Sequence, residues 1–320
     1  MIYIKYVKVT LKVIGFIASI LLLLLIINYV RLNITYMLNK DMYNQALDVH
    51  GNNNKYVPQG LAYSSEYDVV LQTSYNAKHT VSMLYITDFK SGKLLKSLKL
   101  KELNDSDNIN HVGGIATYKD TVWITNNYEV NEYDLKSILS TNDDFVKSRK
   151  NTKLTIRGDF CAFNGGMLYI GDFFLRPFYM VPDNNPLMYV YNYDEGINYN
   201  LPKFIISLPK MVQGLAITDD NKYIFTESFT NLINSKLEVY DDIFKNKKDT
   251  YNLNGKEIPY YKFSKDNLIN TIKLPPMAEG IFYKEDNLYI LFENSSDHYF
   301  FAFPKIKNII SLNKKYYNKR

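Results

Sequence analysis

Short apolar stretches recur along most of the chain, and most of them open with a polar residue followed closely by glycine. The four clearest openings are Gln59-Gly60-Leu61-Ala62, His111-Val112-Gly113-Gly114-Ile115-Ala116, Gln213-Gly214-Leu215-Ala216 and Glu279-Gly280-Ile281-Phe282. A looser fifth opening is Asp159-Phe160-Cys161-Ala162. Each is soon followed by a second apolar stretch, such as VVLQTSYN at 69–76 or NLYILFEN at 287–294. Because these stretches are short and rich in β-branched and aromatic residues, they predict strands.

The openings form a long-period repeat. They start at residues 59, 111, 159, 213 and 279, so the repeat measures between 48 and 66 residues. A third apolar stretch then ends at a turn former, which is Asp88, Asp134, Asp194, Asp241 or, in the last module, Pro304. Such a period with three or four short strands is typical of one propeller blade. We therefore predict an all-β protein, a β-propeller of five four-stranded blades.

Other architectures fit less well. A sixth blade could lie in the 229–279 interval, or residues 40–56 could join the C-terminal strands, and residues 41–57 would suit a segment that closes the ring. A solenoid would show a shorter period or a Leu/Asn ladder, and the Gly-His and Trp-Asp signature of WD40 repeats is absent from the sequence. A β-sandwich with accidental internal similarity is the remaining alternative.

The N-terminal segment has a different pattern. Residues 13–30 carry no formal charge, and at about 1.5 Å per residue a helix of this length spans the hydrocarbon of a bilayer. No small-residue cleavage site follows, so we expect an uncleaved signal anchor more than a cleaved signal peptide. Lys5, Lys8 and Lys12 precede the segment, whereas Arg31 and Lys40 follow it. This bias favours a single-pass protein of the cell membrane, with a cytoplasmic N-terminus and an extracytoplasmic C-terminal domain.

These features divide the chain into five expected parts. They are a basic cytoplasmic N-terminus at 1–12, a transmembrane signal anchor at 13–30, a stalk with a strand available for ring closure at 31–54, the propeller at 55–304 and a basic tail at 305–320.

Charge and composition argue against a nucleic-acid partner and against sites built from several cysteines. The net charge is +5, but between residues 41 and 304 there are 27 Lys and Arg against 33 Asp and Glu. Nucleic-acid binding needs clustered cations, so we expect no nucleic-acid partner. Cys161 is the only cysteine, which rules out an internal disulfide framework and a zinc site built from several cysteines.

The repeat also predicts where polar side chains converge. In a propeller the first strand of each blade lines the axis, so the residues before each glycine should meet at one mouth: Gln59, His111, Asp159, Gln213 and Glu279. A second ring should come from the ends of the next strands: Asn76, Asn126, Asn127, Asp172, Glu227, Ser228, Glu293 and Asn294. Crowded carboxylates repel unless a cation intervenes, and oxygen-rich sets suit Ca²⁺. The candidate metal ligands are Glu279, Glu227, Gln213 and Asn126, and the other candidates at the mouth are Gln59, His111, Asp159, Asp172 and Glu293.

Structural roles compete with these functional ones. Glycine before a strand commonly permits close backbone approach or a bulge. A lone histidine such as His111 is more often a hydrogen-bonded structural residue, and Cys161 suits a small core position. Glu227, Glu279 and Glu293 favour a site more, because acids in channel-facing strands are costly without a purpose.

The repeats over about residues 55–304 resemble those of TolB-like and SMP-30/gluconolactonase-like propellers, and more closely those of uncharacterised bacterial propellers, secreted or membrane-anchored, with PQGLAY and HxGGIA openings. In the lactonase-like enzymes a Glu-Gly, an Asn-Gly-Leu-Ala and an Asp-Ser hold a catalytic divalent cation. Glu279-Gly280 matches the first motif, whereas Gln213 replaces Asn and Glu227-Ser228 replaces Asp-Ser. Both departures lengthen the side chain by a methylene, which puts the expected metal geometry in doubt.

Two functions follow as expectations. The first is a membrane-tethered binding or scaffold module at the bacterial cell surface, with membrane lipid around its helix and an unknown extracellular ligand or protein as partner. The second is a divalent-cation-dependent hydrolase of lactones or esters, in which the ion polarises a carbonyl and a carboxylate moves protons. The sequence lacks GxSxG, HExxH and phosphate-loop motifs, which favours the first. A purely structural role in the envelope is a third alternative.

Overall fold

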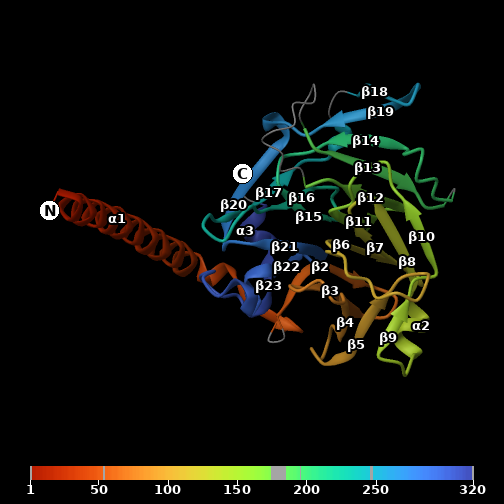
Figure 1. Cartoon of the computed structure of the whole chain (residues 1–320). Coiled ribbons are helices and arrows are strands. Elements are labelled where there is room, and N and C mark those ends of the chain that lie inside the picture. The colour runs from red at the N-terminus through yellow and green to blue at the C-terminus, as the bar shows by residue number, and fades with distance from the viewer. Residues whose placement is uncertain (1, 53–54, 174–184, 195, 246–247, 319–320) are drawn as a thin grey trace.

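The computed structural model describes residues 2–52, 55–173, 185–194, 196–245 and 248–318, and they form a five-bladed β-propeller preceded by one long helix (Figure 1). Five sheets surround a common axis, and each places one strand innermost. These inner strands contact one another in ring order, from blade one round to blade five and back to blade one. The five-bladed prediction is therefore confirmed.

Four consecutive or nearly consecutive strands build each of the first two blades. Blade one contains, from the axis outwards, β2 (Tyr56–Ser64), β3 (Val69–Asn76), β4 (Met83–Asp88) and β5 (Leu94–Lys101). Blade two contains β6 (Gly114–Tyr118), β7 (Thr121–Asn126), β8 (Glu129–Asp134) and β10 (Lys150–Lys153). Between β8 and β10 lie helix α2 (Leu135–Ser140) and β9 (Phe145–Lys147), and β9 adds to blade one beside β5.

The next two blades have the same order. Blade three contains β11 (Phe160–Asn164), β12 (Met167–Gly171), β13 (Leu187–Asn192) and β14 (Phe204–Ser207). Blade four contains β15 (Val212–Ile217), β16 (Tyr223–Glu227), β17 (Ser235–Tyr240) and β20 (Leu268–Leu274). The hairpin of β18 (Asp249–Leu253) and β19 (Lys256–Lys262) extends the outer edge of blade three. The 229–279 interval therefore supplies outer strands to two blades, and no sixth blade forms in the part of the chain that is described.

Blade five joins the two ends of the chain. Its inner strands are β21 (Ala278–Lys284), β22 (Asn287–Phe292) and β23 (Asn308–Asn313), and its outermost strand is β1 (Asn44–Asp48). Gln45 lies opposite Ile310 in the antiparallel β1–β23 ladder. Pairing an N-terminal strand with C-terminal strands closes the ring, because neither end then leaves an unpaired inner strand.

Two expected boundaries differ from the bounds of the structural elements. The propeller extends beyond residue 304, because β23 and the short helix α3 (Lys314–Tyr317) belong to blade five, and Leu312 and Tyr317 are fully buried. The expected basic tail at 305–320 is thus largely part of the fold. The expected stalk is helical in its first part, because helix α1 (Ile2–Leu38) continues without a break to a short 3-10 turn, η1 (Lys40–Met42).

Helix α1 carries the apolar segment. The stretch Thr10–Leu38 contains an 18-residue window with a mean hydropathy of 2.7 and is long and apolar enough to cross a membrane, a property that signal anchors and signal sequences share. In Figure 1 the helix projects away from the ring beside blade five. Its last turns contact the propeller, where Leu32 is buried and Tyr36 packs beside the core of blades four and five.

The core consists of five apolar clusters, one at each interface between neighbouring blades. Glycine permits the inner strands to approach closely at the axis. A Cβ atom on Gly280 would lie 2.4 Å from the backbone N of Leu61 in the next blade, and one on Gly114 would lie 2.5 Å from the backbone N of Cys161. Close backbone approach, the structural role considered for these glycines, therefore explains them.

Candidate functional site

The start of three inner strands is bulged, and the bulges place the residues before the glycines. The register of the first two strands shifts between Pro58 and Leu61 in blade one, between Val212 and Gly214 in blade four and between Ala278 and Ile281 in blade five. A bulge turns an extra residue out of the alternating pattern of a strand. Gln59, Gln213 and Glu279 occupy these bulges and line one cavity on the axis.

This axial cavity, of about 650 Å³, opens at the mouth, the end of the ring at which the inner strands begin. Seven of the nine expected site residues line it: Gln59, His111, Asn126, Asp159, Gln213, Glu279 and Glu293. A smaller hollow of about 190 Å³ lies at the other end of the axis and shares no lining residue with it. Apolar residues next to the glycines, including Leu61, Ile115 and Leu215, line the smaller hollow.

Two buried carboxyl groups lie in the wall of the axial cavity. Glu279 is 4% exposed and its carboxylate accepts a hydrogen bond from Gln213 Nε2 at 2.9 Å. Glu293 is 9% exposed and accepts hydrogen bonds from Gln59 Nε2 and Tyr299 Oη, both at 2.9 Å. Among the described residues, no lysine or arginine forms a salt bridge with either group.

Burial and mutual repulsion make these two groups weaker acids. Burial raises the pKa of Glu279 well above its usual value, and the negative charge of Glu293 raises it further. Burial raises the pKa of Glu293 to about 7, although the hydrogen bonds from Tyr299 and Gln59 oppose the shift. Glu293 therefore titrates near neutral pH and Glu279 holds its proton above its ordinary range, and raised pKa values of this kind are common at functional sites.

Aromatic rings and a histidine form another part of the cavity. The ring of His111 stacks on Tyr75 at 4.2 Å between centroids, and its backbone N–H donates to Asn126 Oδ1 at 3.3 Å. Desolvation lowers the pKa of His111 to about 4, despite the opposing charge of Asp159. The imidazole is therefore neutral at physiological pH. Phe173 and Phe229 also line the cavity.

An ion pair neutralises the third carboxylate. Arg157 donates to Asp159 Oδ1 at 2.8 Å, and Asp159 Oδ2 accepts the backbone N–H of Phe173 at 3.0 Å. The charge that remains in the cavity is that of Glu279 and Glu293. The cavity is thus negative whenever either group is ionised.

Two expected site residues lie elsewhere. Glu227, at the end of β16, does not line the axial cavity, and its nearest charged partners are Lys236 at 3.7 Å and Glu238. Burial and then Glu238 raise the pKa of Glu227 to about 8. Asp172 is not among the residues lining the cavity, and its backbone N–H donates to Leu187 O. Of the four expected metal ligands, Glu279, Gln213 and Asn126 thus line the axial cavity and Glu227 does not. The described residues contain no group of three or more His, Cys, Asp or Glu that could hold a metal ion.

The sequence analysis missed two residues that shape the site. Tyr299 reaches Glu293 from a segment that the repeat assigns to a connection, and Arg157 pairs with Asp159 from the residues before β11. The spacing of Arg157 two residues before Asp159 was visible in the sequence. Nothing in the repeat indicated Tyr299, because no other module has a counterpart.

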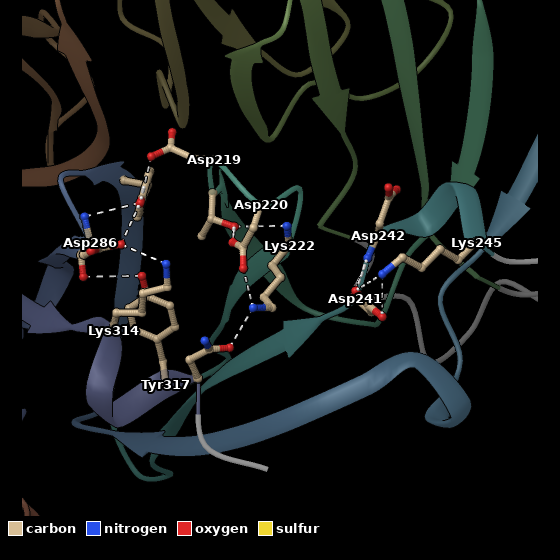
Figure 2. A network of polar contacts seen from close by, with 12 residues as sticks. Asp219, Asp220, Lys222, Asp241, Asp242, Lys245, Asp286, Lys314 and Tyr317 are labelled. Atoms are coloured by element: carbon tan, nitrogen blue, oxygen red, sulfur yellow. Dashed lines mark hydrogen bonds and ion pairs between the residues drawn. The ribbon is translucent and has the colours of Figure 1, made fainter.

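The opposite end of blades four and five is also acidic, but its charges are largely paired (Figure 2). Lys314 bonds Asp286 at 2.9 Å, Lys222 contacts Asp220, and Lys245 bonds Asp241 at 2.9 Å. These residues lie in turns near the surface, where such ion pairs are worth little individually. The acids of these three ion pairs therefore differ from the buried, uncompensated acids of the axial cavity.

Comparison with known proteins extends only to the fold. No protein-family model and no curated protein matches the sequence. Among solved structures, the hydrazine synthase of Kuenenia stuttgartiensis is 10% identical, with 76% of this chain and 57% of that chain covered and a TM-score of 0.41. Glutaminyl cyclase of Myxococcus xanthus is 8% identical over 82% of this chain and 91% of its own, with a TM-score of 0.46. The PQQ-bound aldose sugar dehydrogenase of Streptomyces coelicolor is 13% identical over 84% and 96%, with a TM-score of 0.47. These similarities assign neither a family nor an activity.

Proposed function

We propose that this protein is a membrane-tethered binding module, whose propeller lies outside the cell and binds a small cationic ligand in the axial cavity. The apolar stretch Thr10–Leu38 supports the tether, and the lysines before it favour a cytoplasmic N-terminus. The enclosed position of the polar groups favours a small ligand over a protein partner. A cavity of about 650 Å³ is within the range of small-molecule sites.

The observation that carries this proposal is the uncompensated pair Glu279 and Glu293. Two carboxyl groups that are buried together without a cation repel one another, and one or both hold a proton near neutral pH. A cationic ligand would relieve this repulsion and displace the proton. The rings of Phe173 and Phe229 could add cation–π attraction in the same cavity.

Binding is favoured over the cation-dependent hydrolase for a geometric reason. That hypothesis needs Glu227 beside Glu279, whereas Glu227 contacts Lys236 outside the axial cavity. The remaining acids, Glu279 and Glu293, accept hydrogen bonds from amide groups, an arrangement that suits recognition of a positive charge.

Thermal unfolding of the full chain in detergent micelles tests the proposal. The probes are calcium chloride, choline, ethanolamine and spermidine, which separate a metal cation from organic amines. A ligand that binds only the native state at 100 times its Kd adds about 2.7 kcal/mol of stability, so the melting temperature should rise with at least one probe. The rise should be larger at pH 8 than at pH 5.5, because binding competes with protonation.

The double substitution Glu279→Gln and Glu293→Gln should abolish this rise. Glu257→Gln is the matched control, because Glu257 is an exposed carboxylate on β19. If no probe shifts the melting temperature at either pH, or if the shift survives in the double variant, a cationic ligand of this cavity is excluded.

A further inference from the structure

A second site lies where helix α1 meets the propeller. A groove of about 500 Å³ separates them, and its lining is largely apolar. The helix contributes Leu22, Leu25, Ile26, Asn28, Tyr29 and Leu32. The propeller contributes Asn231, Leu232, Phe301 and Phe303. These four come from two loops at the mouth, one after β16 and one after β22.

Polar contacts hold the helix against these loops. Asn28 Nδ2 donates to the backbone oxygen of Leu232 at 3.0 Å, and the Arg31 guanidinium donates to the same oxygen at 3.4 Å. The ring of Tyr29 meets that of Phe303 edge to face, with 5.0 Å between centroids. Tyrosine and arginine at the end of an apolar helix commonly mark the membrane–water interface.

The two loops also carry an unusual number of exposed apolar side chains. Phe300 and Phe301 are 66% and 73% exposed, and no other large apolar side chain is as exposed in the described part of the propeller. Ile233 and Leu232, in the other loop, are 53% and 46% exposed. Contiguous apolar groups of this kind mark an interaction surface.

The position of the groove identifies what covers it. One wall is formed by Leu22, Leu25 and Ile26, which belong to the apolar stretch Thr10–Leu38. If that stretch spans a bilayer, the surroundings of these side chains are acyl chains. Loops that contact the next turns of the same helix then lie at the boundary of that leaflet.

We propose that residues 229–233 and 300–303 form a lipid-contacting surface, which inserts into the outer leaflet beside α1 and covers the groove with acyl chains. This inference rests on the proposed membrane tether and is independent of the ligand in the axial cavity. Burial in the leaflet is favourable because it removes the exposed aromatic rings from water. The surface would fix the propeller against the bilayer and not leave it free on a flexible tether.

The contact also determines where the mouth of the propeller lies. Phe229 lines the axial cavity and belongs to the first loop, whereas Tyr299, which donates to Glu293, immediately precedes Phe300. The same two loops therefore border both the cavity and the groove. Lipid contact would hold this side of the mouth close to the membrane surface.

Site-directed fluorescence on the full chain tests this surface. Three single variants, Phe301→Cys, Leu22→Cys and Phe244→Cys, are each labelled at the introduced cysteine with an environment-sensitive NBD fluorophore. Each labelled protein is reconstituted into phosphatidylcholine vesicles with or without doxyl-labelled lipid, which quenches a fluorophore that lies among acyl chains. Phe244 is the matched control, because it is an exposed phenylalanine beyond the other end of β17. Cys161 can stay, because burial raises the pKa of its thiol to about 12 and makes it unreactive.

The expected result is quenching by doxyl lipid at residues 301 and 22, with little quenching at residue 244. Quenching at 22 with none at 301 would overturn the lipid-contacting surface and leave the tether intact. Absence of quenching at both would overturn the tether as well. Phe301 is largely exposed, so its substitution leaves the core unchanged, and the unsubstituted chain reports any labelling of Cys161.

Discussion

Replacing Glu293 by glutamine should stabilise the protein at pH 8 and leave its stability nearly unchanged at pH 5. The substitution keeps the size of the side chain and an oxygen that can accept from Gln59 or Tyr299. It removes the ionisation that burial disfavours. The comparison with the natural chain therefore isolates the cost of ionising one buried carboxyl group.

The magnitude follows from the pKa of Glu293, which is about 7 in the folded protein against 4.5 for the free side chain. Below pH 4.5 both states hold the proton, and between the two values only the folded state does. Stability from this group is therefore lost progressively as the pH rises from 4.5 to 7, by roughly 3 kcal/mol in total at 1.36 kcal/mol per pKa unit. The amide costs about 1 kcal/mol in poorer hydrogen bonding. The variant should thus be about as stable as the natural chain at pH 5 and about 2 kcal/mol more stable at pH 8.

Subtracting the free energy of unfolding of the natural chain from that of the Glu293→Gln variant cancels the contributions of other titrating groups. His111 has a lowered pKa and gives the opposite trend, and Glu227 has a raised pKa, but both are present in each protein. Glu279 adds to the expected trend, because loss of the neighbouring charge makes its own ionisation easier. The sign of the difference is therefore determined by the carboxyl pair.

The assay is urea unfolding of the full chain in detergent micelles, at half-unit steps from pH 5 to pH 8. Trp123, the only tryptophan, is buried between blades two and three and reports unfolding by fluorescence. Glu257→Gln should show a difference that does not change with pH. The free energy of unfolding of the Glu293→Gln variant minus that of the natural chain should increase with pH. A value that stays constant, or that falls as the pH rises, would refute the burial argument.

Two further substitutions test the surroundings of this pair and the packing of the ring. Tyr299→Phe removes a hydrogen bond that lowers the pKa of Glu293, so in the same urea titrations the loss of stability should extend to higher pH. An unchanged dependence of stability on pH would mean that this hydrogen bond does not affect the pKa of Glu293. Gly280→Ala places a methyl group 2.4 Å from a backbone nitrogen, so thermal melts should show that the free energy of unfolding falls by well over 2 kcal/mol. The control Gly255→Ala lies at a φ of +83° in open space and should lower the free energy of unfolding by about 1 kcal/mol. Equal losses of stability in the two variants would contradict close packing at the axis.

The inner part of the ring was predictable because its signal is local. Each inner strand begins with a polar residue and usually a glycine, and the next strand follows within a few residues. The outer strands carry a weaker signal, since one of their faces is exposed. In β23, the four residues Ile309, Ile310, Ser311 and Leu312 are flanked by lysine-rich segments, and the charges concealed a strand that completes blade five.

The two glutamates Glu227 and Glu293 show why position was easier to predict than chemistry. Both lie near the ends of second strands, where the repeat predicts side chains around the axis. Glu227 lies directly opposite Lys236 in the β16–β17 ladder and contacts it outside the axial cavity. Glu293 bonds Gln59, which is 234 residues away and is brought close only when the ring closes. The repeat fixes which strand carries an acid, whereas strand register and ring closure decide whether that acid meets a lysine or the cavity.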